Sequence, residues 1–154
     1  MSARTPRKRI AGIDYGTLRI GIAIGDDETQ IASPFETYTR RTLALDAAYF
    51  QKLIKLEQID LLVVGLPIHL SGDESQKSQE ARHFAAWLAE TTSLRVELFD
   101  ERYTSSQAEQ LLQSAELTKK KRKARLDSLA AQIMLTAYFE SASRDGVPQG
   151  LDDR

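Results

Sequence analysis

The chain has 154 residues, of which 42% are hydrophobic and 28% charged, and its 21 lysines and arginines nearly balance its 22 aspartates and glutamates. This length predicts one domain, residues 1–154, with a core that buries about 70% of the surface of the unfolded chain. The absence of cysteine excludes disulfides, thiolate nucleophiles and cysteine-bound metals, and leaves oxygen and imidazole groups as metal ligands.

Basic residues are concentrated in two segments. Four of the 21 lie between positions 4 and 9, where a basic leader (1–8) precedes the first predicted strand, and six lie between 119 and 125. Such a run is commonly a solvated loop, and it is also a usual contact for the phosphates of nucleic acids. No apolar run approaches the roughly 20 residues of a membrane span, so we expect a cytoplasmic protein that does not bind membranes.

The N-terminal segments predict three strands. Residues 9–15 and 19–26 are joined by 16–18, whose length and glycine are typical of a hairpin. A third strand is predicted over 31–39, and Pro34 places it at a sheet edge. The second strand has one bulky face and one nearly bare face, which suits close approach by another helix or backbone. The bulky residues are Ile20, Ile22 and Ile24, and the small ones are Gly21, Ala23 and Gly25.

Helical and strand patterns then alternate. Apolar residues recur at helical spacing over 43–56, and the apolar run 61–64, ended by Gly65, is typical of a parallel strand covered on both faces. An amphipathic helix follows, and residues 94–99 alternate as a strand that leads to Asp100. The predicted inward residues are Leu43, Ala47, Phe50 and Ile54 in the first helix and Ala81, Phe84, Ala85 and Leu88 in the second.

The C-terminal third predicts two more helices. A short helix over 104–115 precedes the basic segment, and a last helix runs over 125–143 before a frayed tail, 145–154. The element order is then β-β-β-α-β-α-β-α-α. This order predicts an α/β domain with a mixed five-stranded sheet, in which three antiparallel strands are followed by parallel strands, flanked by helices.

Acidic residues follow two of the predicted strands. Asp14 closes the first strand, Asp100 and Glu101 close the last, and Asp127 begins the terminal helix. Chemistry in open α/β sheets gathers at the carboxyl ends of strands. Converging carboxylates repel one another and take up protons unless a hard divalent cation such as Mg²⁺ or Mn²⁺ binds between them. Such a site suits hydrolysis of a phosphodiester.

Each acid also has a simpler explanation. Asp14 stands close to a glycine and can act as a turn residue. Asp100 or Glu101 can pair with Arg102 at the surface, and Asp127 can stabilise a helix N-terminus. A shared site requires the acids to lie close together in space, whereas these separate explanations do not.

Four motifs resemble the YqgF family, a bacterial group of Holliday-junction-resolvase-like proteins regarded as pre-16S rRNA nucleases. The motifs are GIDYGT at 12–17, VVGLP at 63–67, DERYTS at 100–105, and the basic segment followed by Asp127. They occur in the family's order and extend the resemblance over 8–143, nearly the whole chain. The resemblance therefore rests on several separate segments.

The resemblance implies an RNase H-like fold and a Mg²⁺- or Mn²⁺-dependent endonuclease that processes the 5′ end of precursor 16S rRNA during ribosome biogenesis. It assigns the catalytic and metal-binding roles to Asp14, Glu101 and Asp127. Asp100 is the rival of Glu101, because neighbouring strand residues point to opposite faces. The implied nucleic-acid contacts are Arg19, Arg102, Thr104, Lys119, Lys120, Lys121, Arg122 and Lys123.

The sequence departs from junction resolvases proper at two positions. Those proteins carry an acid at the end of the fourth strand and another three residues after the helix acid, where this chain has 65–67 (Gly-Leu-Pro) and Ala130. Three carboxylates remain, enough to hold one metal well and a second only with substrate phosphate present.

Other functions and partners stay open at this point. The alternatives are a Holliday-junction-type resolvase acting on branched DNA, and a non-catalytic nucleic-acid-binding or transcription-associated module. Residues 14–17 also resemble the phosphate loop of actin-like ATPases, which close two such domains around a nucleotide. The expected partners are structured precursor rRNA, branched DNA or ribosomal particles, and the expected state is a monomer or weak homodimer.

Overall fold

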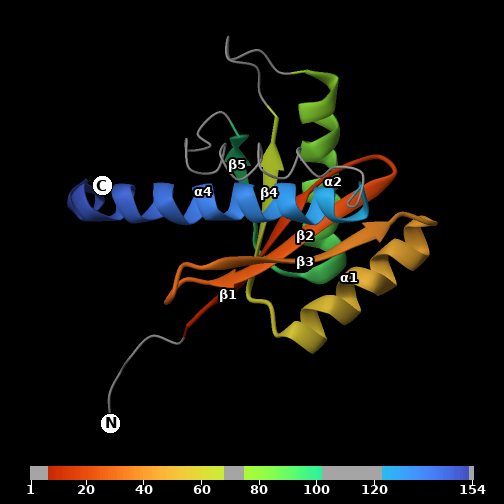
Figure 1. Ribbon diagram of the computed structural model, residues 1–154, viewed down its shortest axis with the longest axis horizontal. Helices are drawn as coiled ribbons and strands as arrows, with labels where there is room; N and C mark the ends of the chain where they lie inside the picture. Colours follow the sequence, from red (N-terminus) through yellow and green to blue (C-terminus); the bar gives the residue numbers. More distant parts are fainter. Residues whose placement is uncertain (1–6, 68–74, 102–122, 153–154) are drawn as a thin grey trace.

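The structure is a computed structural model that describes residues 7–67, 75–101 and 123–152, with only the backbone described for 123–126 and 143–152. The described elements follow one another in the order shown in Figure 1. They are β1 (Arg9–Asp14), β2 (Arg19–Asp26), β3 (Ala32–Thr39), α1 (Leu43–Glu57), β4 (Leu61–Leu66), α2 (Gln76–Thr92), β5 (Val96–Asp100) and α4 (Lys123–Asp152). This order confirms the predicted succession of elements, except that the predicted helix 104–115 lies outside the described residues.

The strands form one mixed sheet in the order β3-β2-β1-β4-β5. β1 pairs antiparallel with β2, and β2 with β3, whereas β4 is parallel to both β1 and β5. The predicted α/β fold with three antiparallel strands followed by parallel strands is therefore confirmed. β3 lies at an edge, and the register between β2 and β3 shifts between Ile22 and Ala23, opposite Pro34. Proline cannot donate a ladder hydrogen bond, which explains both features.

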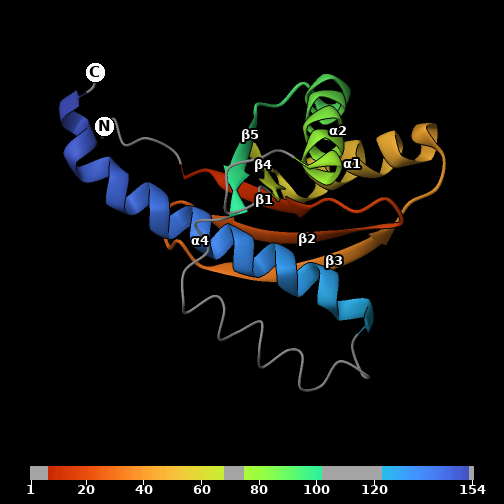
Figure 2. The same ribbon diagram turned by 90° about the horizontal axis from the view of Figure 1, so that it is seen from above.

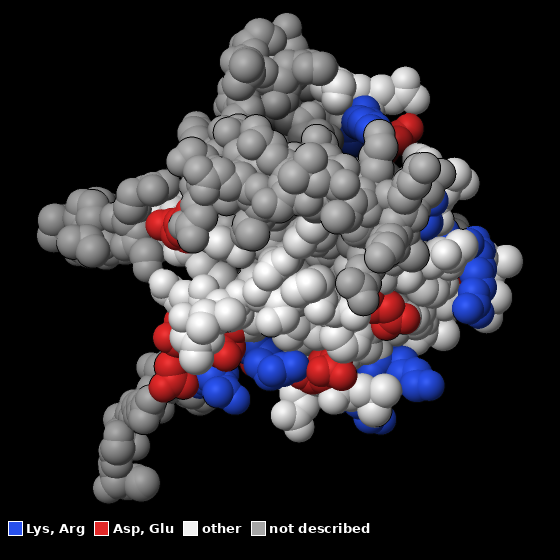
Figure 3. Space-filling view, viewed as in Figure 1, with Lys and Arg blue, Asp and Glu red and all other residues white. Residues whose placement is uncertain are grey.

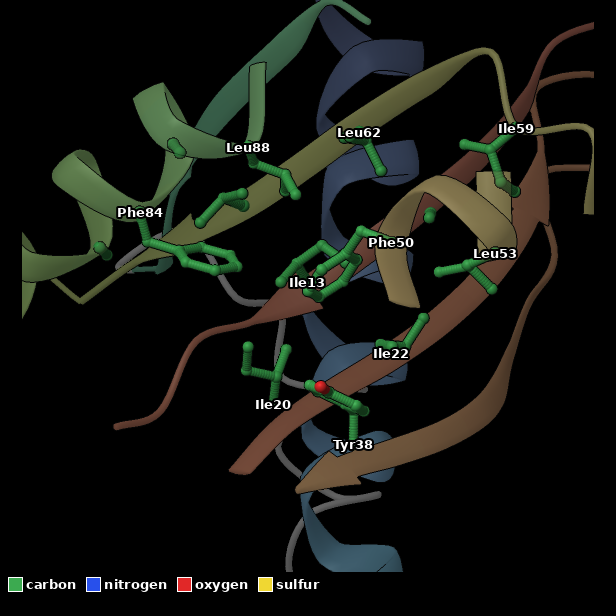
Figure 4. Close-up of a cluster of buried hydrophobic side chains, with 14 of the residues drawn as sticks. Ile13, Ile20, Ile22, Tyr38, Phe50, Leu53, Ile59, Leu62, Phe84 and Leu88 are labelled. Carbon is green, nitrogen blue, oxygen red and sulfur yellow. The ribbon is translucent and has the colours of Figure 1, made fainter. Parts of the chain in front are cut away.

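Helices cover both faces of the sheet (Figure 2). α1 and α2 lie on one face, where helix residues such as Phe50 enclose a core with strand residues that include Ile13 and Ile22 (Figure 4). α4 lies on the other face, where its residues, including Leu135, form a second core with strand residues that include Val63. Since successive strand residues face opposite sides, each strand contributes alternately to the two cores.

The bare face of β2 meets α4. A Cβ atom added at Gly21 would overlap the backbone carbonyl of Asp127, and one at Gly25 would stand 2.9 Å from the Phe139 ring. On β1, a Cβ at Gly12 would stand 3.0 Å from the Leu135 side chain. The predicted close approach of a helix to this strand is confirmed, and it brings the start of α4 down onto the hairpin.

The inward face of α1 differs from the prediction. Leu43 is 61% exposed, whereas Asp46 is only 1% exposed. Phe50 and Leu53 are buried as the helical spacing predicts. Asp46 takes the inward position of the first turn because its carboxylate accepts hydrogen bonds there from Tyr38 and Arg40, which compensates its burial.

Helix α4 is longer than the sequence predicts. The prediction ends the helix at 143, but the structure continues it to Asp152, through the segment predicted to be frayed, and in Figure 1 this end projects beyond the sheet. A helix already anchored on the sheet adds further residues without a new nucleation cost, so low-propensity residues such as Gly146 and Pro148 do not end it. None of the described helices combines the length and apolar character needed to cross a membrane.

Candidate active site

A cavity of about 380 Å³ lies where the ends of β1 and β4 and the residue after β5 meet the first part of α4. Its wall contains three acidic side chains that the sequence singled out, those of Asp14, Glu101 and Asp127. The turn between β1 and β2 and residues of α2 that include Lys77 and Glu80 complete it. The three predicted catalytic acids therefore share one cavity, as a common site requires.

The β1–β2 hairpin brings Asp14 close to Asp127. Asp14 pairs with Gly21 in the sheet, and Gly21 lies directly under the backbone of Asp127. Ile13 and Tyr15 pack in the core under α1 and α2, so strand alternation turns the Asp14 side chain toward α4. The glycine thus places one acid beside the other.

Glu101, rather than Asp100, joins these two acids. A Cβ atom at Gly65 would overlap the Glu101 carboxylate, so this carboxylate fills the space that the missing side chain leaves at the end of β4. Asp100 is not among the residues lining the cavity. The sequence left the choice between the two open, and the geometry places Glu101 with Asp14.

The cavity concentrates negative charge. Burial raises the pKa of Asp14 to about 7, and the nearby charges of Glu101 and Asp127 add to the effect of burial. Burial also raises the pKa of Glu101, with a smaller contribution from Asp100. Lys77 opposes both shifts. A pocket with this balance of charge favours a bound cation.

Two basic side chains line the same cavity. Arg19 donates from Nε to Oδ2 of Asp127 at 2.7 Å, so the predicted nucleic-acid contact Arg19 is engaged with a predicted catalytic acid. The Lys77 side chain makes no ion pair or hydrogen bond with another described residue. On the face seen in Figure 3, the described basic and acidic side chains are intermixed rather than gathered by sign. Arg19 and Lys77 are therefore the described basic residues that bring positive charge to the cavity.

Lys77 is the site residue that sequence reasoning missed. It lies in the first turn of α2, two residues after the N-cap Ser75, where the helix dipole disfavours a positive charge. That unfavourable position was the signal in the sequence, because negative charge from elsewhere is then needed to offset the helix dipole. The acids of the cavity supply it.

The donor chemistry of the cavity fits a divalent cation. Carboxylate oxygens are the ligands that Mg²⁺ and Mn²⁺ prefer, and the charges of Glu101 and Asp127 add to the effect of burial in raising the pKa of Asp14. Within the described ranges, no three acidic or histidine side chains already stand in a metal-holding arrangement, and Asp127 is held by Arg19. For Asp127 to become a third ligand, its carboxylate has to move toward the other two acids, and Arg19 competes for its Oδ2.

The remaining predicted nucleic-acid contacts are not among the residues whose side chains are described. Lys123 begins α4, of which only the backbone is described at that point. The others lie outside the described residues, namely Arg102, Thr104, Lys119, Lys120, Lys121 and Arg122.

Solved structures of two resolvases share the fold. The structure described as "T. thermophilus RuvC in complex with Holliday junction substrate" gives a TM-score of 0.58 at 18% identity, covering 91% of this chain and 97% of that one. The fowlpox virus resolvase with Holliday junction DNA gives 0.52 at 14% identity, covering 86% and 97%. These likenesses confirm the expected RNase H-like fold.

Sequence comparison identifies the family. Residues 8–141 match the family described as "RuvX: Holliday junction resolvase". A Rhodopirellula baltica protein named "Putative pre-16S rRNA nuclease" is 49% identical over 138 residues, 90% of this chain and 80% of that protein. A protein of the same name from Koribacter versatilis is 39% identical over 137 residues, 89% and 90% of the two chains. The chain belongs to the RuvX (YqgF) family of nucleases, the family that its motifs resemble.

Proposed function

We propose that this protein is a divalent-metal-dependent endonuclease that cleaves precursor 16S rRNA near its 5′ end. The observation that carries the proposal is the shared cavity of Asp14, Glu101 and Asp127, with the raised pKa of Asp14. The RNA substrate is inferred from the relatives named for pre-16S rRNA. Such a substrate implies a cytoplasmic protein that meets ribosomal precursors, and Mg²⁺ or Mn²⁺ is the proposed metal.

The carboxylates of Asp14, Glu101 and Asp127 would hold the metal. When bound, a divalent cation in such a site lowers the pKa of an attacking water and stabilises the leaving oxygen of the phosphodiester. Arg19, once separated from Asp127, becomes available to donate to a substrate phosphate. We assign the same backbone-positioning role to Arg102, Thr104 and the basic segment Lys119, Lys120, Lys121, Arg122 and Lys123.

Cleavage assays with two substrates test this function. Purified protein is incubated with a labelled 16S precursor carrying its 5′ extension, and in parallel with a four-way DNA junction, in Mg²⁺, Mn²⁺ or chelator. We expect a discrete RNA product near the mature 5′ end in either metal and none in chelator. Preferential cutting of the junction would favour a DNA resolvase, in keeping with the description of the family as Holliday junction resolvases. Metal-independent binding without cutting of either substrate would favour a non-catalytic module.

Gly65→Ala is expected to lower RNA cleavage by about tenfold to a hundredfold, because the added methyl displaces the Glu101 carboxylate from its place beside Asp14. The displaced group is the end of a flexible side chain, so the melting temperature is expected to change little. Single-turnover cleavage and thermal unfolding of the variant measure the two effects. A variant that cleaves like the wild type would show that the Glu101 carboxylate is not needed at this position.

We also assign a substrate-phosphate contact to Lys77, whose side chain lines the cavity and makes no ion pair with another described residue. Lys77→Gln is therefore expected to weaken RNA binding and to reduce the slope of log affinity against log salt by about one, because this contact is lost. Binding titrations at several salt concentrations, with Asp14→Asn as the background to prevent cleavage, provide the measurement. Lys52→Gln is the matched control, since Lys52 is an exposed lysine of α1 outside the cavity. Equal salt slopes for the two lysine variants would contradict a phosphate contact by Lys77.

A further inference from the structure

A buried carboxylate lies behind the β1–β2 turn, on the side away from the cavity acids. Asp46 is 1% exposed and accepts hydrogen bonds from Tyr38 Oη at 2.6 Å, from the Arg41 backbone N–H at 2.9 Å and from Arg40 Nε at 3.2 Å. Burial alone would raise the pKa of Asp46, but these hydrogen bonds outweigh it and lower the pKa. Asp46 is therefore a fixed, ionised anchor for Arg40.

Arg40 connects this anchor to the turn at two points. Its Nη1 donates to Tyr15 Oη at 3.2 Å, and its backbone N–H donates to the Leu18 carbonyl at 3.0 Å. The guanidinium carbon lies 5.5 Å from the centre of the Tyr15 ring and 5.6 Å from that of Phe84. The centres of the two rings are 4.8 Å apart. Arg40 thus contacts both ends of the segment 15–18.

The segment 15–18 links two residues of the candidate active site. Asp14 precedes it, Arg19 follows it, and both line the cavity together with the segment itself. Asp14 and Tyr15 are adjacent and face opposite sides of the sheet. A backbone shift at Tyr15 on one side is therefore passed directly to the residue that carries the Asp14 carboxylate on the other.

We propose that Arg40, anchored by Asp46, is a positioning residue that holds the β1–β2 turn through Tyr15 and Leu18 and so fixes the carboxylate of Asp14 for catalysis. This inference rests on the proposed nuclease function. Buried ion pairs add little stability compared with apolar residues of similar size, and their best-supported benefit is a unique geometry. A catalytic carboxylate needs such a geometry, since displacement by about 1 Å can reduce a rate by roughly a hundredfold.

Tyr15→Phe is the sharpest test, because it removes only the hydroxyl that Arg40 holds and keeps the ring packed against Phe84. Tyr49→Phe is its matched control. Tyr49 also packs against the same core, and its hydroxyl donates to Glu36 at 3.0 Å, away from the turn. A purely structural role predicts similar behaviour of the two variants.

Two readouts are compared in the full-length protein. Hydrogen exchange of the backbone amides at 16–19 is expected to accelerate in Tyr15→Phe and to stay unchanged in Tyr49→Phe. In cleavage kinetics, kcat of Tyr15→Phe is expected to fall by about tenfold while KM for the RNA is unchanged, because the turn still binds but no longer holds Asp14 in place. Tyr49→Phe is expected to keep the wild-type kcat.

The possible outcomes distinguish a failure of the positioning role of Arg40 from a failure of the proposed nuclease function. Unchanged exchange at 16–19 in Tyr15→Phe would overturn the inference whether or not the protein is a nuclease. Faster exchange with an unchanged kcat would overturn the positioning role and leave a contact that only stabilises the fold. A wild type that cleaves no RNA would overturn the proposed function and the catalytic part of this inference, while the exchange result still tests the clamp on the turn separately.

Discussion

Asp14→Asn is expected to reduce RNA cleavage by roughly a thousandfold, the equivalent of about 4 kcal/mol of transition-state stabilisation. The substituted asparagine keeps the shape of the side chain but not the charge that attracts a divalent cation. RNA binding is expected to survive, because the basic groups that contact phosphate are unchanged. Cleavage and binding are measured on the same RNA, with Glu90→Gln, at an exposed acid of α2 outside the cavity, as the control.

The same variant is expected to be more stable than the wild type at pH 8 in the presence of chelator. The pKa of Asp14 is about 7 in the folded protein, against an ordinary value of 3.8. A raised pKa in the folded state gives a stability contribution that is complete below about pH 4 and is lost as the pH rises through 7. The asparagine does not ionise, so Asp14→Asn avoids this loss, which amounts to at most about 4 kcal/mol.

Thermal unfolding of both proteins at pH 5 and pH 8, in chelator, measures this difference. The melting temperature of Asp14→Asn is expected to exceed that of the wild type by several degrees at pH 8 and by less at pH 5. Saturating Mg²⁺ or Mn²⁺ is expected to narrow or reverse the difference, because a ligand that binds only the folded wild type stabilises it. A difference that does not change with pH would contradict the raised pKa of Asp14, which burial and, to a lesser extent, the charges of Glu101 and Asp127 produce.

Gly21→Ala is expected to combine a large loss of stability with a large loss of activity. The added methyl would overlap the backbone carbonyl of Asp127, and a backbone atom of a packed helix cannot rotate away as a side chain can. Overpacking of this kind costs about 1 to 3 kcal/mol, which lowers the melting temperature by roughly 3 to 9 °C in a protein of this size. Since the start of α4 then moves away from the hairpin, cleavage is expected to fall by about a hundredfold.

Gly12→Ala provides the comparison for this prediction. It lies on the neighbouring strand and faces the same helix, but its added methyl would stand 3.0 Å from Leu135 Cβ, a close contact rather than the overlap with backbone found at Gly21. We expect a smaller loss of stability and nearly normal cleavage. Equal cleavage by the two alanine variants would show that the position of Asp127 over Gly21 is not important for the reaction.

The sequence predicts most of the fold because its signals are local. Helical spacing, alternation, and the small residues along β2 are patterns within short segments, and they predict the element order and the close approach of a helix to β2. The buried Asp46 was not predictable in this way. Its partners Tyr38 and Arg40 lie at the end of β3 and just after it, so the inward polar residue depends on where β3 is held beside β2 and not on the spacing within the helix.

The candidate site was predictable in its residue types but not in its details. The acids at strand ends indicated a shared site, and the family resemblance assigned Asp14, Glu101 and Asp127 to it. The choice of Glu101 over Asp100 required the empty position at Gly65, which only the packing of β4 against β5 reveals. The role of Lys77 required the approach of α2 to the cavity, since nothing near it in the sequence is an acid of the site.

Anomalous X-ray diffraction from crystals grown with Mn²⁺ tests the shared carboxylate site most directly. We predict an anomalous peak in the cavity, in contact with the carboxylates of Asp14 and Glu101, with Asp127 turned toward it and released from Arg19. Crystals of Asp14→Asn under the same conditions are expected to lack the peak. No peak in the wild type, or a peak that persists unchanged in Asp14→Asn, would contradict a metal site built on these three acids.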